Sequence, residues 1–382
     1  MTRREPLFTP PFFRLWAFTF ITFITAFQLF PTIPLRIIDL GGSTAAGGRF
    51  LAIYTWACAI AAPLTGTIAD HLGRKRALVT AAIAFILFSA LYGVTTWIPL
   101  LLVFACIHGI FWSALMSSSA AIMSEIIPAS RRTEGIAYWG LASTAAVAVG
   151  PLIGLTLYQR GWTWLAVAMT ALSCGMLVLS LRVPGGVERS HGPFPAFGGL
   201  IDWRVILTAL ALFAMSYSYG GITSYVAIFA TERNVRPASL FFTVFAIAIL
   251  MTRVLTSRIG DRFGPRALLY PSWVLVPAGL ALLPFSDSPL AFGVSAAVFG
   301  AGFGGAYPAF VTYVLGRTAP ARRGATFGSI LFAFDMGIGS GSLITGILAE
   351  RSGFPVAFAT AAILSALSIP LFAATSRLLP ES

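Results

Sequence analysis

Long apolar segments recur along the whole chain, and they constrain its fold more than any other feature. Each is near the length, about 20 residues, that crosses a membrane as a helix, and short breaks with charged residues, proline or glycine separate them. In lipid, only helices and closed barrels satisfy all their backbone polar groups. The sequence therefore predicts an all-α membrane protein with twelve transmembrane helices, at residues 12–34, 47–69, 76–95, 98–122, 134–157, 162–182, 204–229, 238–257, 266–285, 288–313, 324–348 and 355–375.

The composition favours a membrane protein over the other classes. Of the 382 residues, 57% are hydrophobic and 10% are charged, whereas soluble proteins average about 25% charged residues. This balance excludes a disordered chain and a nucleic-acid-binding domain, and it makes a water-soluble enzyme a poor hypothesis. Cys58, Cys106 and Cys174 all lie within apolar runs, so we interpret them as small apolar side chains rather than disulfide partners or metal ligands.

The basic residues predict the orientation of the chain. If the N-terminus is cytoplasmic, most of the 25 Lys and Arg residues fall in cytoplasmic loops, including clusters at 74–76, 131–132 and 322–323. This positive-inside distribution fits twelve spans with both termini in the cytoplasm. The net charge of +12 is then mainly an orientation signal. The first apolar run is interpreted as a retained helix, since it is too long for the core of a signal peptide.

An internal repeat divides the chain into two halves. Corresponding loop residues recur with an offset of 191 positions, half the chain length: Asp70 and Asp261, Arg131-Arg132 and Arg322-Arg323, and Gln159-Arg160 and Glu350-Arg351. Duplication predicts two pseudo-symmetric six-helix bundles, residues 1–182 and 203–382, joined by a cytoplasmic linker at 183–202. Transporters often place a substrate site between such repeats, near the bilayer midplane.

Several motifs resemble those of the major facilitator superfamily. The loop Gly66-x-x-x-Asp70-His71-x-Gly73-Arg74-Lys75 is similar to the family signature G-x-x-x-D-[RK]-x-G-[RK]-[RK], with His71 as the departure. Gly150-Pro151-Leu152-Ile153-Gly154 is similar to its antiporter motif G-P-x-x-G, and the stretch Gly300 to Gly341 resembles the sugar-efflux and multidrug-efflux (drug:proton antiporter) branch. The resemblance implies the major facilitator fold, alternating access, a monomer and a bacterial inner membrane.

The resemblance also implies a cytoplasmic latch, in which a carboxylate at a helix end pairs with arginines in one conformation only. The alternative is a solvated turn that fixes topology. The candidate latch residues are Gly66, Asp70, Gly73, Arg74, Asp261, Arg262, Arg266, Arg131 and Arg132. In the fifth span, a kink is expected at Gly150, Pro151 and Gly154, because proline removes a helical hydrogen bond.

Ionisable residues inside the spans are the candidates for proton coupling. Asp335 is the one acidic residue well inside an apolar span, where a carboxylate must be paired, hydrated or protonated. We expect a protonation site or a ligand for a substrate cation, with a structural hydrogen bond as the alternative. Arg253 could pair with Asp335 or extend to the headgroups. His108 could titrate or be a neutral, hydrogen-bonded residue of the bundle.

Aromatic and polar residues are expected where the fold implied by the resemblance would line a central cavity. Aromatic rings suit an amphipathic or cationic organic substrate, through stacking and cation–π contact. Bundle packing is the alternative for each of them individually. The candidates are Gln28, Trp112, Tyr217, Tyr219, Tyr225 and Tyr307.

Together these features predict a secondary transporter rather than an enzyme. The favoured function is proton-coupled efflux of a small amphipathic organic compound. One alternative is uptake or facilitated transport of a small metabolite such as a sugar or organic acid, and another is a transporter-like receptor that does not transport. The sequence has no phosphate-binding G-x-x-x-x-G-K-[ST] loop and no clustered metal ligands. No cofactor is therefore expected, with a proton as the coupling ion.

Overall fold

The computed structural model describes residues 5–184, 202–319 and 322–379, apart from the side chains of residues 133, 257–261 and 324. The described residues form helices and connecting turns, with no β-strand among them. The helices are α1 (Pro10–Leu29), α2 (Ile33–Asp39), α3 (Thr44–Leu72), α4 (Arg74–Val94), α5 (Ile98–Ile126), α6 (Arg132–Arg160), α7 (Trp162–Arg182), α8 (Trp203–Glu232), α9 (Leu240–Phe263), α10 (Arg266–Leu282), α11 (Pro289–Gly316), α12 (Arg323–Ser352), α13 (Phe354–Ala366) and α14 (Ser368–Thr375), with short 3-10 turns η1 (Ala129–Arg131), η3 (Leu283–Phe285) and η5 (Ser376–Leu378). The predicted linker at 183–202 lies mostly outside these ranges.

The prediction of an all-α membrane protein is confirmed. Within the described residues, eleven helical segments are long and apolar enough to cross a membrane, and the apolar part of α9, Leu240–Thr256, is shorter. These segments match the predicted spans closely, with differences at the two ends of the chain.

Both differences coincide with prolines. The predicted helix 12–34 is two helices, because α1 ends at Leu29 before Pro31, and α2 begins at Ile33. A proline disfavours helical geometry in the residue before it and lacks an N–H. The predicted helix 355–375 divides at Leu367 into α13 and α14. There Pro370 cannot donate the helical hydrogen bond to Ala366.

The chain folds as two compact units. Unit 1 contains Met1–Leu29 and Ala61–Phe194, and unit 2 contains Phe30–Ile60 and Pro195–Ser382. Helix α3 therefore belongs to both: its first half packs within unit 2 and its second half within unit 1. The two compact units reflect packing and therefore need not coincide with the two halves of the sequence repeat. The division into halves by repeat stays a prediction.

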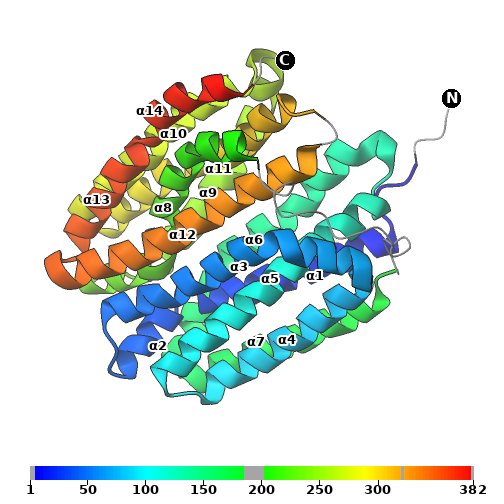
Figure 1. The fold of residues 1–382 in the computed structure, drawn as a ribbon. Coiled ribbons are helices and arrows are strands. Elements are labelled where there is room, and N and C mark those ends of the chain that lie inside the picture. Colours follow the sequence, from blue (N-terminus) through cyan, green and yellow to red (C-terminus); the bar gives the residue numbers. More distant parts are fainter. Residues whose placement is uncertain (1–4, 185–201, 320–321, 380–382) are drawn as a thin grey trace. The chain divides into compact units, whose positions relative to one another are not determined.

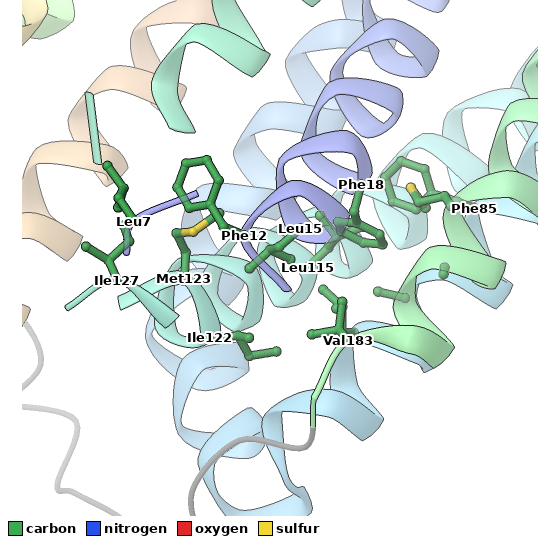
Figure 2. Packing of buried hydrophobic residues seen from close by; sticks show 14 residues of the cluster. Leu7, Phe12, Leu15, Phe18, Phe85, Leu115, Ile122, Met123, Ile127 and Val183 are labelled. Carbon is green, nitrogen blue, oxygen red and sulfur yellow. The ribbon is translucent and has the colours of Figure 1, made fainter. Parts of the chain in front are cut away.

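The core of unit 1 forms where α1 meets α4 and α5. Figure 2 shows Leu15 and Phe18 of α1 close to Leu115 of α5 and Phe85 of α4, all fully buried. Val183, which follows α7, belongs to the same cluster. Apolar side chains at helical spacing thus hold these helices together in unit 1.

In unit 2, α8 and α12 run side by side in close contact (Figure 1). Glycines allow this approach. A Cβ atom added at Gly220 would clash with the backbone carbonyl of Ile338, and one added at Gly341 would clash with that of Tyr217. Small residues commonly permit such backbone contact between membrane helices. The close contact fixes the position of the middle of α12, which carries Asp335.

Candidate functional site

Asp335 lies near the middle of the 30-residue helix α12 and is half-buried. The thiol of Cys58, on the first half of α3, donates a hydrogen bond to its Oδ2 atom at 3.4 Å. Within the described part of the chain, no basic side chain forms an ion pair with Asp335. Because a thiol is a weak donor, this contact orients the carboxylate without neutralising it.

Helix α3 is also held against α12 at Met336, directly after Asp335, and at Gly339, one turn beyond it. The indole Nε1 of Trp56 donates to the backbone carbonyl of Met336 at 3.3 Å. A Cβ added at Gly339 would lie 2.6 Å from that Nε1 and 2.5 Å from Oγ1 of Thr55. The glycine therefore lets α3 come close enough for Cys58 to reach Asp335.

Aromatic side chains of α8, α9 and α11 form a series of ring contacts with Phe334, the residue before Asp335 on α12. Phe334 and Tyr307 of α11 have ring centroids 5.0 Å apart, and Phe334 lies 6.2 Å from Phe303. Phe303 stacks on Tyr219 of α8 at 4.5 Å, and Tyr219 stacks on Phe245 of α9 at 5.8 Å. These five residues, Tyr219, Phe245, Phe303, Tyr307 and Phe334, are called the aromatic cluster below.

A carboxylate can take up a proton or pair with a cation, and aromatic rings can contact an organic cation. Phe303, Tyr307 and Phe334 are half-buried, as Asp335 is, so part of each ring is free to contact another molecule. The face of an aromatic ring attracts cations and stacks on planar apolar groups. A carboxylate beside such rings supplies the one charge that a cationic substrate requires.

Four of the six predicted cavity residues lie in unit 2, the unit that holds this site. Tyr219 and Tyr307 belong to the aromatic cluster. Tyr217 is buried where α8 meets Gly341. Tyr225 is fully buried and donates its hydroxyl to the Thr44 carbonyl at 2.8 Å, so it acts in packing here.

The other two predicted cavity residues lie in unit 1. Gln28 is fully buried on α1, where Gly154 of α6 packs against its backbone. Trp112 of α5 is half-buried and lies 5.2 Å from the ring of Phe23 and 6.2 Å from that of Phe85.

Within the described part of unit 2, Arg253 forms no ion pair with Asp335, and His108 lies in unit 1. His108 is buried in unit 1, with its Nδ1 atom 3.2 Å from the hydroxyl of Tyr92. The rings of Phe85 and Phe88 lie 4.3 Å and 5.3 Å from the imidazole. This environment matches a hydrogen-bonded histidine of the bundle. Arg253 is exposed on α9, as expected for a side chain that extends away from the core.

The loop that resembles the family signature forms a compact ion cluster in unit 1. Arg74 Nε lies 2.7 Å from Asp70 Oδ1, and Arg74 also pairs with Glu125 of α5. Gly73 has φ of +96°, a conformation that favours glycine, and so lets α4 begin directly after α3. A Cβ added at Gly66 would lie 3.9 Å from Oγ of Ser117, an ordinary contact distance. Sequence reasoning missed Glu125, which no motif marks.

The other predicted latch residues are spread over several contacts. Arg131 binds Glu134 at 2.8 Å, and this hydrogen bond raises the pKa of the guanidinium above its ordinary value. Arg132 donates to the Ser124 carbonyl at 3.4 Å. Arg266 donates to the hydroxyl of Tyr313 at 2.9 Å.

In the second copy of the loop, the guanidinium of Arg262 lies 5.2 Å from the ring centroid of Phe263. The side chain of Asp261 lies outside the described residues.

The antiporter-like motif lies where α6 packs on α1. A Cβ added at Gly150 would lie 2.8 Å from Cβ of Phe27, and one at Gly154 would lie 2.7 Å from the Gln28 carbonyl oxygen. Pro151 sits inside the continuous helix α6. The two glycines therefore serve close packing, and the expected kink stays a prediction.

Sequence reasoning also missed much of the neighbourhood of Asp335. Phe299, Phe303 and Tyr307 recur every four residues on α11, a spacing that places them on one helix face. That pattern could have indicated the aromatic cluster. The interpretation of Cys58 as a small apolar side chain is incomplete, because its thiol donates a hydrogen bond to Asp335. The two residues are 277 positions apart in the chain, so the sequence alone does not show this contact.

The fold and this site define a multi-pass α-helical membrane protein with a carboxylate and aromatic rings in the middle of its helices, as transporters have. The sequence profile of the Major Facilitator Superfamily matches residues 15–237 and 208–381, and the chain belongs to this family.

Curated relatives and solved structures agree with this membership. An uncharacterized MFS-type transporter of Burkholderia mallei is 26% identical, covering 93% of this chain and 89% of the relative. Escherichia coli YhhS, also an uncharacterized MFS-type transporter, is 24% identical with the same coverage. A POT family transporter crystallised with 5-aminolevulinic acid has a TM-score of 0.82 at 12% identity, covering 96% of both chains. A bacterial homolog of the human lysosomal transporter Spinster has a TM-score of 0.76 at 14% identity, covering 98% of both chains.

Proposed function

We propose that this protein is a proton-coupled secondary transporter that exports a small amphipathic organic compound, preferably one with a positive charge. Membership of a transporter family supports the general class. The carrying observation is Asp335, a half-buried carboxylate in the middle of α12 that contacts a thiol and adjoins the aromatic cluster.

The chemistry of one such carboxylate suits exchange of a proton for a cation. In an apolar span the group is stable when it is protonated or when a positive charge neutralises it. Proton and cationic substrate would therefore compete for Asp335, and each would leave when the other binds. The aromatic cluster supplies faces on which the apolar part of the substrate can stack.

Export is favoured by the antiporter-like motif Gly150-Pro151-Leu152-Ile153-Gly154 in α6. The proposal further includes a monomer in the bacterial inner membrane with both termini in the cytoplasm, as the distribution of basic residues predicts. Asp70 and Arg74, at the cytoplasmic end of α3 in this orientation, would act as the latch on that side.

Flux in proteoliposomes tests the proposal. A thermal-shift screen with lipophilic cations and with neutral and anionic compounds of similar size first identifies a ligand. An imposed pH gradient should then drive movement of that ligand by the wild type but not by Asp335→Asn. The matched control is Asp39→Asn, an exposed carboxylate at the end of α2, which should behave as wild type. Equal gradient-driven flux in wild type and Asp335→Asn would contradict the proposal.

A further inference from the structure

The N-terminal end of α3 is held by side chains of two other helices in unit 2. Glu350, near the end of α12, accepts a hydrogen bond from the backbone N–H of Ala45 through Oε2, at 2.9 Å. Tyr225 of α8 donates its hydroxyl to the backbone carbonyl of Thr44, at 2.8 Å. These two contacts satisfy a donor and an acceptor of adjacent residues, so the first turn of α3 is fixed to α8 and α12.

The contact from Glu350 differs from an ordinary helix cap. Ser43 already provides a local cap, because its Oγ accepts from the N–H of Ala46 at 3.2 Å. That bond moves with α3 wherever the helix goes. Glu350 lies 305 positions from Ala45 in the chain, so the hydrogen bond between them exists only while α3 and α12 stay together. A negative charge at a helix N-terminus is favoured by the helix dipole.

From this contact toward Asp335, α3 and α12 run antiparallel and touch at successive levels. Ser342 Oγ donates to the Gly48 carbonyl at 3.2 Å, and Ser342 in turn lies 2.7 Å from Ser224 Oγ of α8. Next come the contacts of Thr55 and Trp56 with Gly339, described above. The last level is the hydrogen bond from Cys58 to Asp335. We call this set of contacts, from Glu350 to Asp335, the α3–α12 seam.

We propose that Glu350 is the latch of the α3–α12 seam, holding the seam closed at the end of α3 opposite to Asp70. The two carboxylates act at the two ends of the sequence of α3, Glu350 at its first turn and Asp70 in its last turn. Closing one end and opening the other is what alternating access demands, so this inference rests on the proposed function. Gln159, the counterpart of Glu350 in the sequence repeat, carries no charge.

Loss of the Glu350 contact would also affect the candidate coupling site at Asp335. Cys58 is buried at the inner end of the seam, and Glu350 lies at its outer end. Separation of α3 from α12 would remove the Cys58 hydrogen bond from Asp335 and expose both groups to the same side. Arg49 and Arg351, which are exposed and within electrostatic range of Glu350, would pair with the released carboxylate.

The rate at which Cys58 reacts with a thiol reagent tests the latch directly. With Cys106 and Cys174 replaced by alanine, Cys58 is the remaining thiol. A membrane-impermeant maleimide is added to oriented proteoliposomes on the face that carries Glu350. Glu350→Gln should raise the initial rate about two- to five-fold, the range that corresponds to a helix-dipole interaction, and Glu350→Ala should raise it at least as much. Glu232→Gln, the same change at an exposed carboxylate at the end of α8, should leave the rate unchanged.

The assay needs neither a substrate nor a pH gradient, so its outcome is separate from that of the transport proposal. Unchanged rates in both Glu350 variants would overturn the latch, even if gradient-driven flux were found. A raised rate without any flux would support the latch and remove the transport proposal alone. Loss of the thermal unfolding transition in both variants would overturn it too, since Glu350 would then be required for folding rather than for gating.

Discussion

The thiol of Cys58 donates a hydrogen bond to the carboxylate of Asp335 at 3.4 Å, joining the middle of α3 to the middle of α12. Any compound that binds Asp335 must therefore come close to Cys58. We expect such a ligand to slow the reaction of Cys58 with maleimide in a variant that lacks Cys106 and Cys174. Protection should rise with ligand concentration and be absent from Asp335→Asn. Full labelling at saturating ligand would place the binding site elsewhere.

Two rings of the aromatic cluster, those of Tyr307 and Phe334, should discriminate charged from neutral ligands. Replacing Tyr307 or Phe334 by leucine keeps the apolar volume but removes the ring face. A cation–π contact is worth about 0.5–2 kcal/mol, so affinity for a cationic ligand should fall about two- to thirty-fold, with a smaller loss for a neutral analogue. Isothermal titration measures both. Phe285→Leu, an exposed ring on η3, is the control, and an equal loss for both ligands would count against a cation site.

Packing of α8 on α12 predicts a pair of opposite stability effects within one helix. Gly341→Ala would force a methyl group into the Tyr217 carbonyl, and such overpacking costs about 1–3 kcal/mol. Gly328→Ala, on the same helix, meets no atom within 4 Å and should be neutral or stabilising, because alanine favours the helix. Thermal unfolding in detergent compares the two. Equal midpoints would show that the close approach at Gly341 is not required.

His108 is expected to stabilise unit 1 without taking part in coupling. A double-mutant cycle with Tyr92→Phe and His108→Phe should give a coupling energy of about 0.5–1.5 kcal/mol, the net value of a buried hydrogen bond. Neither variant should abolish gradient-driven flux. Flux lost in His108→Phe at unchanged stability would instead assign the histidine a role in proton transfer.

The fold was largely predictable because the membrane imposes one simple rule on the chain. Each span needs a long apolar run, so the runs alone located the helices to within a few residues at most ends. Pro31 and Pro370 were visible as well, but whether a proline ends a helix or only bends it depends on packing around the backbone groups it leaves unpaired.

The site was predictable only where a residue is unusual for its surroundings. Asp335 stood out because a carboxylate in an apolar span is costly. Cys58 and Trp56 did not, since a thiol and an indole are ordinary in such runs, and their contacts with α12 depend on tertiary packing. Tyr225 was predicted as a cavity residue for its type, yet the notch formed by Gly48 and Gly346 buries it against Thr44.

The central claim is that a proton and a cationic ligand compete for Asp335. Proton release measures this most directly: the ligand found in the thermal-shift screen is added to purified protein in weakly buffered detergent solution near neutral pH, and the pH change is recorded. The account predicts release that saturates with binding at up to about one proton per wild-type molecule, with none from Asp335→Asn and wild-type release from Asp39→Asn. Binding without proton release from the wild type at any pH near neutrality, or equal release from Asp335→Asn, would contradict it.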